Sequence, residues 1–206
     1  MKKWIVPSAA AFIAIFISIV AYDSLPAQMV VNFSDPQNAG SGVDKRIAVS
    51  LFPFLILVLS WVVLFLIRIE KDENKRKRTE YMVSAINGIS TIVILAAHGF
   101  IIAYNLDYHL SFAVFVTFVV GGTFVLIGNL LPRLPQGTYA WPKMEEFRHR
   151  HLARFAGRLM VGFGLLFIIV ALLPGSYIFP VFFIILGCFI VIMVGKSIQT
   201  TIPNNK

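Results

Sequence analysis

The sequence predicts an all-α integral membrane protein, a bundle of six transmembrane helices with both termini in the cytoplasm. The chain is 58% hydrophobic and 14% charged, whereas soluble domains are about 45–50% apolar and about 25% charged. Six apolar runs are close to the roughly 20 residues that a bilayer-spanning helix needs. Basic residues fall almost entirely on one side of these runs, which sets the predicted orientation.

The predicted spans together form one membrane domain, 1–206. In lipid, every backbone polar group has to be satisfied within the segment, so runs of this length are expected to be helices. The first run continues past its small residues, so we expect a retained span rather than a cleaved signal peptide. The fifth run is the shortest, and we expect Arg158 at its start to extend toward the membrane surface. The spans are approximately 4–22, 47–67, 82–104, 110–131, 157–173 and 177–195.

The loops differ in charge. With this orientation, 16 of the 18 Lys and Arg residues lie on the cytoplasmic side. They fall near the termini and in two inner loops, 68–81 and 132–156, and the second half of 132–156 is expected to extend the fifth helix. The outer side has one sizeable loop, 23–46. The net charge of +8 is thus explained by topology and by contact with membrane lipids, and direct nucleic-acid binding is not expected.

Polar residues within the spans are candidates for function. His98, in "ILAAHGF", makes the third run the most polar, together with Asn87, Ser90 and Thr91. One interpretation is a polar lumen or a peptide-sensing site. The other is a neutral imidazole bonded to a neighbouring helix, for instance near Thr117 or Asn105. Asn129 lies at the inner end of the fourth run, where it is expected to cap the helix or bond to the loop.

Small residues let membrane helices approach closely. Glycines in the fourth and fifth runs are expected to make such contacts. They are Gly121, Gly122, Gly157, Gly162 and Gly164.

The segment "EEFRHRH" carries the only candidate metal ligands. Glu145 and His149 share a helix face, and Glu146 and His151 lie beside them. The letters resemble the EExxxR and FxxxH motifs of the type II CAAX-protease family, which would imply an intramembrane metalloprotease. In that family the motifs lie on separate helices, whereas here they overlap, and no histidine is followed four residues later by asparagine. The alternative is a solvated helix start with acids before bases, and with that interpretation we expect no cofactor and no enzyme.

The opening of the outer loop is the first of three segments that resemble those of a known family. "YDSLPAQMVVNFSDPQNAGSGVDKR", "GNLLPRLPQGTYAWP" and "AGRLMVGFG" occur here in the order in which similar segments occur in the bacterial SdpI/YfhL family. Val30 and Asn32 replace a proline and a histidine of the family pattern, and its Gly-Ile-Arg-Thr segment is absent. The positions that resemble the family are Tyr22, Leu25, Pro26, Phe33, Gly40, Lys45, Gly128, Asn129, Pro132, Gly137, Trp141, Gly157 and Arg158.

This resemblance implies a multi-pass protein of the bacterial plasma membrane that gives immunity to a secreted killing peptide. It also implies a second partner, a cytoplasmic repressor that is drawn to the membrane. The Leu-Pro pair is expected to end the first helix, and "MVVNF" to form a short strand or extended segment. The alternative functions are the metalloprotease and a transporter for a small solute or lipid. Residues expected to bind the toxin or partner are Tyr22, Leu25, Pro26, Asn32, Phe33, His98, Asn129, Trp141 and Arg158.

Overall fold

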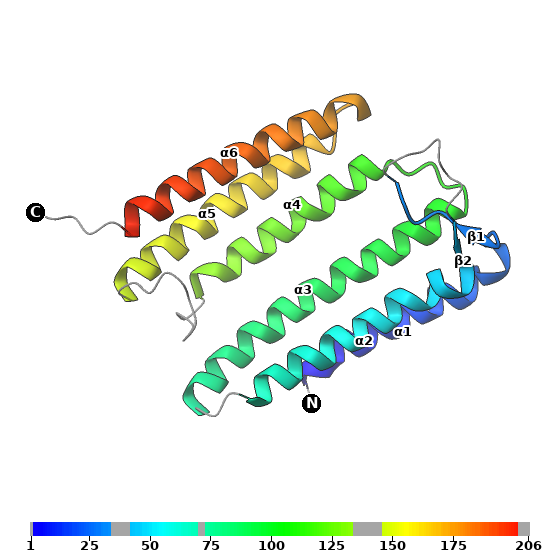
Figure 1. The fold of residues 1–206 in the computed structure, drawn as a ribbon, viewed down its shortest axis with the longest axis horizontal. Coiled ribbons are helices and arrows are strands. Elements are labelled where there is room, and N and C mark those ends of the chain that lie inside the picture. Colours follow the sequence, from blue (N-terminus) through cyan, green and yellow to red (C-terminus); the bar gives the residue numbers. More distant parts are fainter. Residues whose placement is uncertain (1, 34–41, 70–72, 134–145, 202–206) are drawn as a thin grey trace, which may run out of the picture. The chain divides into compact units, whose positions relative to one another are not determined.

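The computed structural model describes residues 2–33, 42–69, 73–133 and 146–201. Within these ranges, six helices are long and apolar enough to cross a membrane (Figure 1). This confirms the predicted all-α class, and the only strands are two short ones in the described outer loop. The helices are α1 (Lys2–Ala21), α2 (Lys45–Ile69), α3 (Glu73–Asn105), α4 (Phe112–Leu130), α5 (Glu146–Val170) and α6 (Gly175–Thr201).

Helices reach further into the inner loops than the apolar runs do. α3 begins at Glu73 and α5 at Glu146, so much of the predicted loops 68–81 and 132–156 is helical. The expected extension of the fifth helix is confirmed. The reason is that Glu, Lys and Arg are good helix formers, so a helix can continue into water beyond its apolar part.

The chain divides into two compact units, residues 1–112 and 113–206, and each is described here by itself. In the first unit, α1, α2 and α3 pack against one another. Small residues of α1 make this possible: Ala10, Ala11 and Ala14 are buried in one cluster with Ile56 of α2. Ile94 and Leu95 of α3 pack against the same cluster.

In the second unit, glycines bring α4 and α5 into backbone contact. A Cβ added to Gly121 would lie 2.8 Å from the Gly164 carbonyl oxygen, and one added to Gly128 would lie 2.7 Å from that of Gly157. Each pair is thus too close for any larger side chain. The predicted contacts of Gly121, Gly157 and Gly164 are confirmed. Gly122 and Gly162 have open space around them, so the prediction was wrong for these two.

Aromatic side chains fill the rest of the second unit. Phe167 of α5 is fully buried and contacts Phe124 of α4 and Phe182 of α6, with ring centroids 5.4 and 4.7 Å apart. Phe189 of α6 also contacts Phe124. The core therefore depends on edge-to-face and tilted ring pairs, which are favourable arrangements for aromatic side chains.

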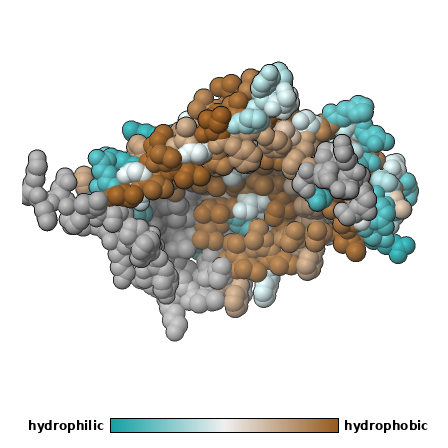
Figure 2. Space-filling view, turned by 45° about the horizontal axis from the view of Figure 1, so that its top comes forward, coloured by the Kyte–Doolittle hydropathy of each residue, from teal (hydrophilic) through white to brown (hydrophobic). Residues whose placement is uncertain are grey.

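Large apolar side chains cover the outward faces of the helices. Phe12, Ile19 and Val191 each expose about 70% of their surface, and only 11% of the most apolar window of α6 is buried within the protein. Figure 2 shows hydrophobic side chains over the helices and hydrophilic ones toward the ends of the elements. Water does not tolerate apolar surface on this scale, whereas lipid does, so the chain is a multi-pass membrane protein.

Candidate functional site

A structured cap closes one end of the first unit. We call residues 22–33 and 42–46 the outer cap, because the predicted orientation places them outside the cell. It contains a 3₁₀ turn (Tyr22–Ser24) and two antiparallel strands, β1 (Gln28–Met29) and β2 (Val43–Asp44). A short strand or extended segment was expected at "MVVNF", and of these five residues only Met29 lies in a strand, as the second residue of β1. Met29 is fully buried, so the cap has its own apolar anchor.

Asn105, the last residue of α3, holds the cap to the helix. Its Oδ1 accepts a hydrogen bond from the Val30 N–H at 2.7 Å, and its Nδ2 donates to the Val30 carbonyl oxygen at 2.9 Å. Nδ2 also donates to the Ile101 carbonyl oxygen at 2.8 Å. The amide thus satisfies both the backbone N–H and the backbone carbonyl oxygen of Val30.

Phe33 is the second anchor of the cap. Its ring lies 4.8 Å from the Tyr104 ring, 4.8 Å from the Phe112 ring and 5.4 Å from the Phe100 ring, measured between centroids. Three aromatic partners in one cluster fix both the position and the angle of this side chain. The segment that follows β1 is therefore tied to α3 by an amide and by an aromatic cluster.

Lys45 ties the beginning of the cap to its end. Its Nζ lies 4.4 Å from the centroid of the Tyr22 ring and donates a hydrogen bond to the Tyr22 carbonyl oxygen at 3.3 Å. Its backbone N–H donates to the Ala27 carbonyl oxygen. Next to it, Asp44 caps α2 by accepting a hydrogen bond from the Arg46 N–H. These contacts fix the chain where it enters α2.

The structure assigns different roles to the residues predicted to bind a toxin in this loop. Leu25 is buried, and Tyr22 and Phe33 are partly buried and make the contacts described above. These three side chains hold the cap together. Pro26 and Asn32 are exposed.

His98 is buried between the helices of the first unit. Its Nε2 lies 3.1 Å from the Ala14 carbonyl oxygen and 2.9 Å from Ser18 Oγ, both on α1. A carbonyl oxygen only accepts, so the neutral ring carries its proton on Nε2 and donates to Ala14. Nδ1 is then a buried acceptor with no partner in the described part of the chain. The expectation of a neutral imidazole bonded to a neighbouring helix matches this geometry.

One expected neighbour of His98, Asn105, was wrong, because its side chain bonds to the outer cap. The other, Thr117, belongs to the second unit, and its hydroxyl has no hydrogen-bond partner among the described residues. Ser18 was missed, although it lies four residues after Ala14 and continues the small-residue face of α1. That spacing was the signal that could have found it.

A serine hydroxyl beside an imidazole raises the question of a nucleophile. Ser18 Oγ donates to the Ala14 carbonyl oxygen at 2.9 Å, and Nε2 of His98 already carries a proton for the same oxygen. The histidine nitrogen that faces the hydroxyl therefore has no free lone pair with which to act as a base. Both side chains are also more than 90% buried. The pair links α1 to α3.

Other polar residues of α3 face the same interior. Asn87 and Thr91 are buried, and the Ser60 hydroxyl of α2 lies 3.5 Å from Asn87 Oδ1. Thr91 Oγ1 has no partner within the described residues. α3 thus presents Asn87, Thr91 and His98 to α1 and α2, in agreement with its predicted polar character.

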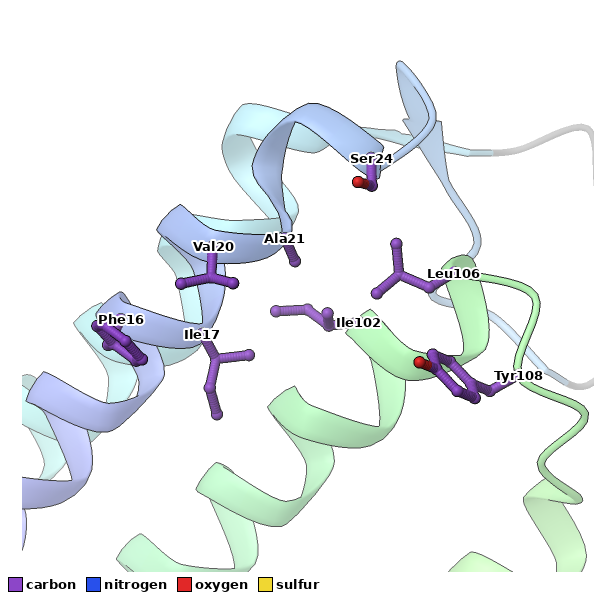
Figure 3. A pocket seen from close by; sticks show the side chains of 8 residues that line it. All are labelled: Phe16, Ile17, Val20, Ala21, Ser24, Ile102, Leu106 and Tyr108. Carbon is purple, nitrogen blue, oxygen red and sulfur yellow. The ribbon is translucent and has the colours of Figure 1, made fainter.

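An apolar groove of about 500 Å³ lies between α1 and the end of α3. Figure 3 shows Ile17 of α1 and Ile102 of α3 pointing toward each other, with Ser24 at the start of the cap and Tyr108 in the segment after α3. Ala21 and Ile102 are buried, whereas Tyr108 is mostly exposed. The groove is therefore open to the surroundings. Its lining is Phe16, Ile17, Val20, Ala21, Ser24, Ile102, Leu106 and Tyr108.

Two carboxylates adjoin this groove in the sequence. Asp23 precedes the lining residue Ser24, and Asp107 lies between the lining residues Leu106 and Tyr108. Both are exposed, and neither has an ion-pair partner in the part of the chain that the structure describes. Asp107 has a positive φ of 61°, a conformation that Asp and Asn adopt more readily than other side chains. Each carboxylate thus belongs to a residue that directly adjoins a lining residue in the chain.

The remaining predicted site residues are spread over the second unit. Asn129 is exposed near the end of α4, and Arg158 is exposed on α5. Glu146 begins α5, where His149 is partly buried and His151 exposed. Trp141 and Glu145 lie outside the described residues. Within the described ranges, no three His, Cys, Asp or Glu side chains are grouped as metal ligands.

The fold and these sites define a class: a six-helix membrane protein with an ordered cap and an apolar groove at one end of its first three helices. No family model, curated protein or solved structure matches the chain. Membership of the SdpI/YfhL family therefore stays a prediction from the ordered motifs.

Proposed function

We propose that this chain is an integral membrane immunity protein that protects a bacterial cell against a secreted antimicrobial peptide. The peptide would bind at the predicted outer ends of α1 and α3. The observation that supports this proposal is the open groove beside a cap fixed by Asn105 and Phe33. A fixed cap presents its exposed residues to a ligand without a large ordering cost.

The chemistry of the groove favours a cationic amphipathic peptide. Aliphatic and aromatic side chains provide most of its lining, which suits the apolar face of such a peptide. Asp23 and Asp107, beside the lining residues and without ion-pair partners in the described chain, suit its lysine or arginine side chains. The same carboxylates repel the headgroup of an anionic phospholipid. A peptide is therefore the better ligand than an anionic lipid.

The proposal is tested by survival. The chain is expressed in a sensitive bacterium, which is then challenged with a panel of cationic amphipathic peptides. We expect resistance to at least one peptide, and the double substitution Asp23→Asn with Asp107→Asn should reduce that resistance roughly tenfold, which corresponds to about 1.4 kcal/mol of binding. Asn at position 107 keeps the positive φ accessible.

Asp44→Asn is the matched control. It also removes one exposed carboxylate from the cap, but it adjoins no groove residue, and Asn still caps α2. We expect full resistance in this variant. Unchanged survival with every peptide would refute the immunity function. Resistance that Asp44→Asn lowers as much as the double variant would instead refute the assignment of the groove.

A further inference from the structure

Two arginines on the exposed face of α5 have no partner for their charge. Arg154 and Arg158 lie four residues apart and therefore one turn apart on the same face. Both are exposed, and neither makes a hydrogen bond or an ion pair with any described residue. The same face continues into Leu165 and Ile169, which expose 51% and 60% of their surface. The two charges thus stand on a surface that becomes lipid-facing within two turns.

The depth of these arginines follows from the neighbouring helix. The apolar part of α6 ends at Lys196, whose Nζ lies 5.7 Å from the centroid of the Phe155 ring on α5. Phe155 therefore lies near the boundary of the hydrocarbon. Arg158 is three residues further along α5, which places its Cα about 4.5 Å deeper, and Arg154 lies at the boundary itself.

The two helices have no acidic side chain after Glu146 that could neutralise these groups. From Phe147 to Lys206 the sequence contains no Asp or Glu, so neither α5 after its first residue nor α6 carries a carboxylate. A charged side chain facing hydrocarbon is costly unless it reaches the headgroup layer or a counter-ion. The counter-ion of this pair has to come from outside the two helices.

We propose that Arg154 and Arg158 bind the phosphate of an anionic phospholipid in the leaflet predicted to be cytoplasmic. Guanidinium groups match phosphate oxygens with two parallel hydrogen bonds each, and a phosphate at the boundary lies within reach of both turns. An anionic headgroup fits better than a zwitterionic one, because Lys196 adds positive charge at the same level and these helices carry no acidic side chain after Glu146 to hold an amine. The lipid holds α5 at a fixed depth although its apolar part is short.

Native mass spectrometry of the purified full chain in detergent tests this site. Phosphatidylglycerol or phosphatidylcholine is added in matched titrations, and lipid adducts are counted. We expect phosphatidylglycerol to bind more tightly, and Arg154→Gln with Arg158→Gln to weaken it roughly tenfold or more while leaving phosphatidylcholine unchanged. The paired Lys substitutions, which keep the charge but lose the bidentate geometry, should give an intermediate loss.

Arg46→Gln is the control, because it removes an exposed arginine that the predicted orientation places at the outer membrane face. It should bind phosphatidylglycerol as the unmodified chain does. Thermal unfolding without added lipid confirms that each variant is folded. If the Gln variants do not fold, the Lys variants are used to test the site in their place. The proposal would be overturned if the two lipids bound equally well, or if the Gln and Lys variants bound phosphatidylglycerol fully. It would also be overturned if Arg46→Gln weakened phosphatidylglycerol binding as much as the paired Gln substitutions, or if millimolar inorganic phosphate displaced the lipid.

Discussion

Single polar side chains decide where the segments of the first unit meet. His98 donates to the backbone of α1, and Asn105 holds the backbone of Val30 in the outer cap. In an apolar solvent these groups cannot turn to water instead, so their partners lie within the protein. Few polar residues thus have a large effect on how α1, the cap and α3 fit together.

Asn105→Ala should loosen the cap without unfolding the helices. The substitution removes three hydrogen bonds, so we expect a loss of about 2 kcal/mol of stability and faster proteolysis within residues 22–46. Thermal unfolding in detergent and the rate of cleavage measure these effects. Asn129→Ala, at an exposed position of α4, is the control and should leave both unchanged. Identical cleavage in the two variants would show that the amide does not hold the cap.

At the scale of elements, the two units use small residues in different ways. On α1, Ala10, Ala14 and Ser18 follow one another every four residues, and they let α1 approach α2 and α3. On α4 and α5, glycines seven residues apart pair across an antiparallel contact. A spacing of seven returns to nearly the same face of a helix, so two glycine pairs fix the register of α4 against α5.

Substituting the paired glycines should destabilise the second unit, whereas substituting their neighbours should not. In Gly121→Ala and Gly164→Ala the new Cβ meets a backbone oxygen at 2.8 and 2.7 Å, and we expect a cost of about 1–3 kcal/mol from overpacking. Gly122→Ala and Gly162→Ala meet nothing within 4 Å. Helix propensity makes these two neutral or slightly stabilising. Thermal unfolding in detergent compares the four variants, and equal effects would rule out the close contact.

For the whole molecule, the helices and the charges together predict an orientation. Six spans return the chain to the side from which it started, and the basic residues place that side in the cytoplasm. The outer cap, the groove and the carboxylates near it would then meet an external ligand. Arg154 and Arg158 would meet the cytoplasmic leaflet.

Labelling of single cysteines checks this orientation. Cys188, exposed on α6, is first replaced by serine. Ser24→Cys, in the cap, should react with a membrane-impermeant maleimide in intact cells. His151→Cys, in the first turns of α5, should react only after the membrane is permeabilised, because both positions are exposed and the predicted orientation places them on opposite sides. The reverse pattern would invert the orientation, and with it the sides assigned to the peptide and to the lipid.

Much of the candidate site lay beyond the reach of sequence reasoning. Tyr22, Leu25 and Phe33 were recognised as special residues, but as contacts for a ligand, whereas they hold the cap. The groove was not predicted, because predicting it requires knowing how α1 and α3 are each turned about their own axes. Gly122 and Gly162 were expected to pack and do not, since a glycine in a sequence does not show which way it faces.

The sequence by itself determined the class of protein, the six spans and the helical extension before the fifth span. Length, hydrophobicity and helix propensity are properties of a segment and its solvent, so they can be read without knowing any neighbour. The tertiary structure alone decided which residues meet: His98 with Ser18 across 80 residues, Asn105 with Val30 across 75, and Gly121 with Gly164. These pairings depend on the facing of each helix and on the closeness of its neighbours, which packing sets and no single segment encodes.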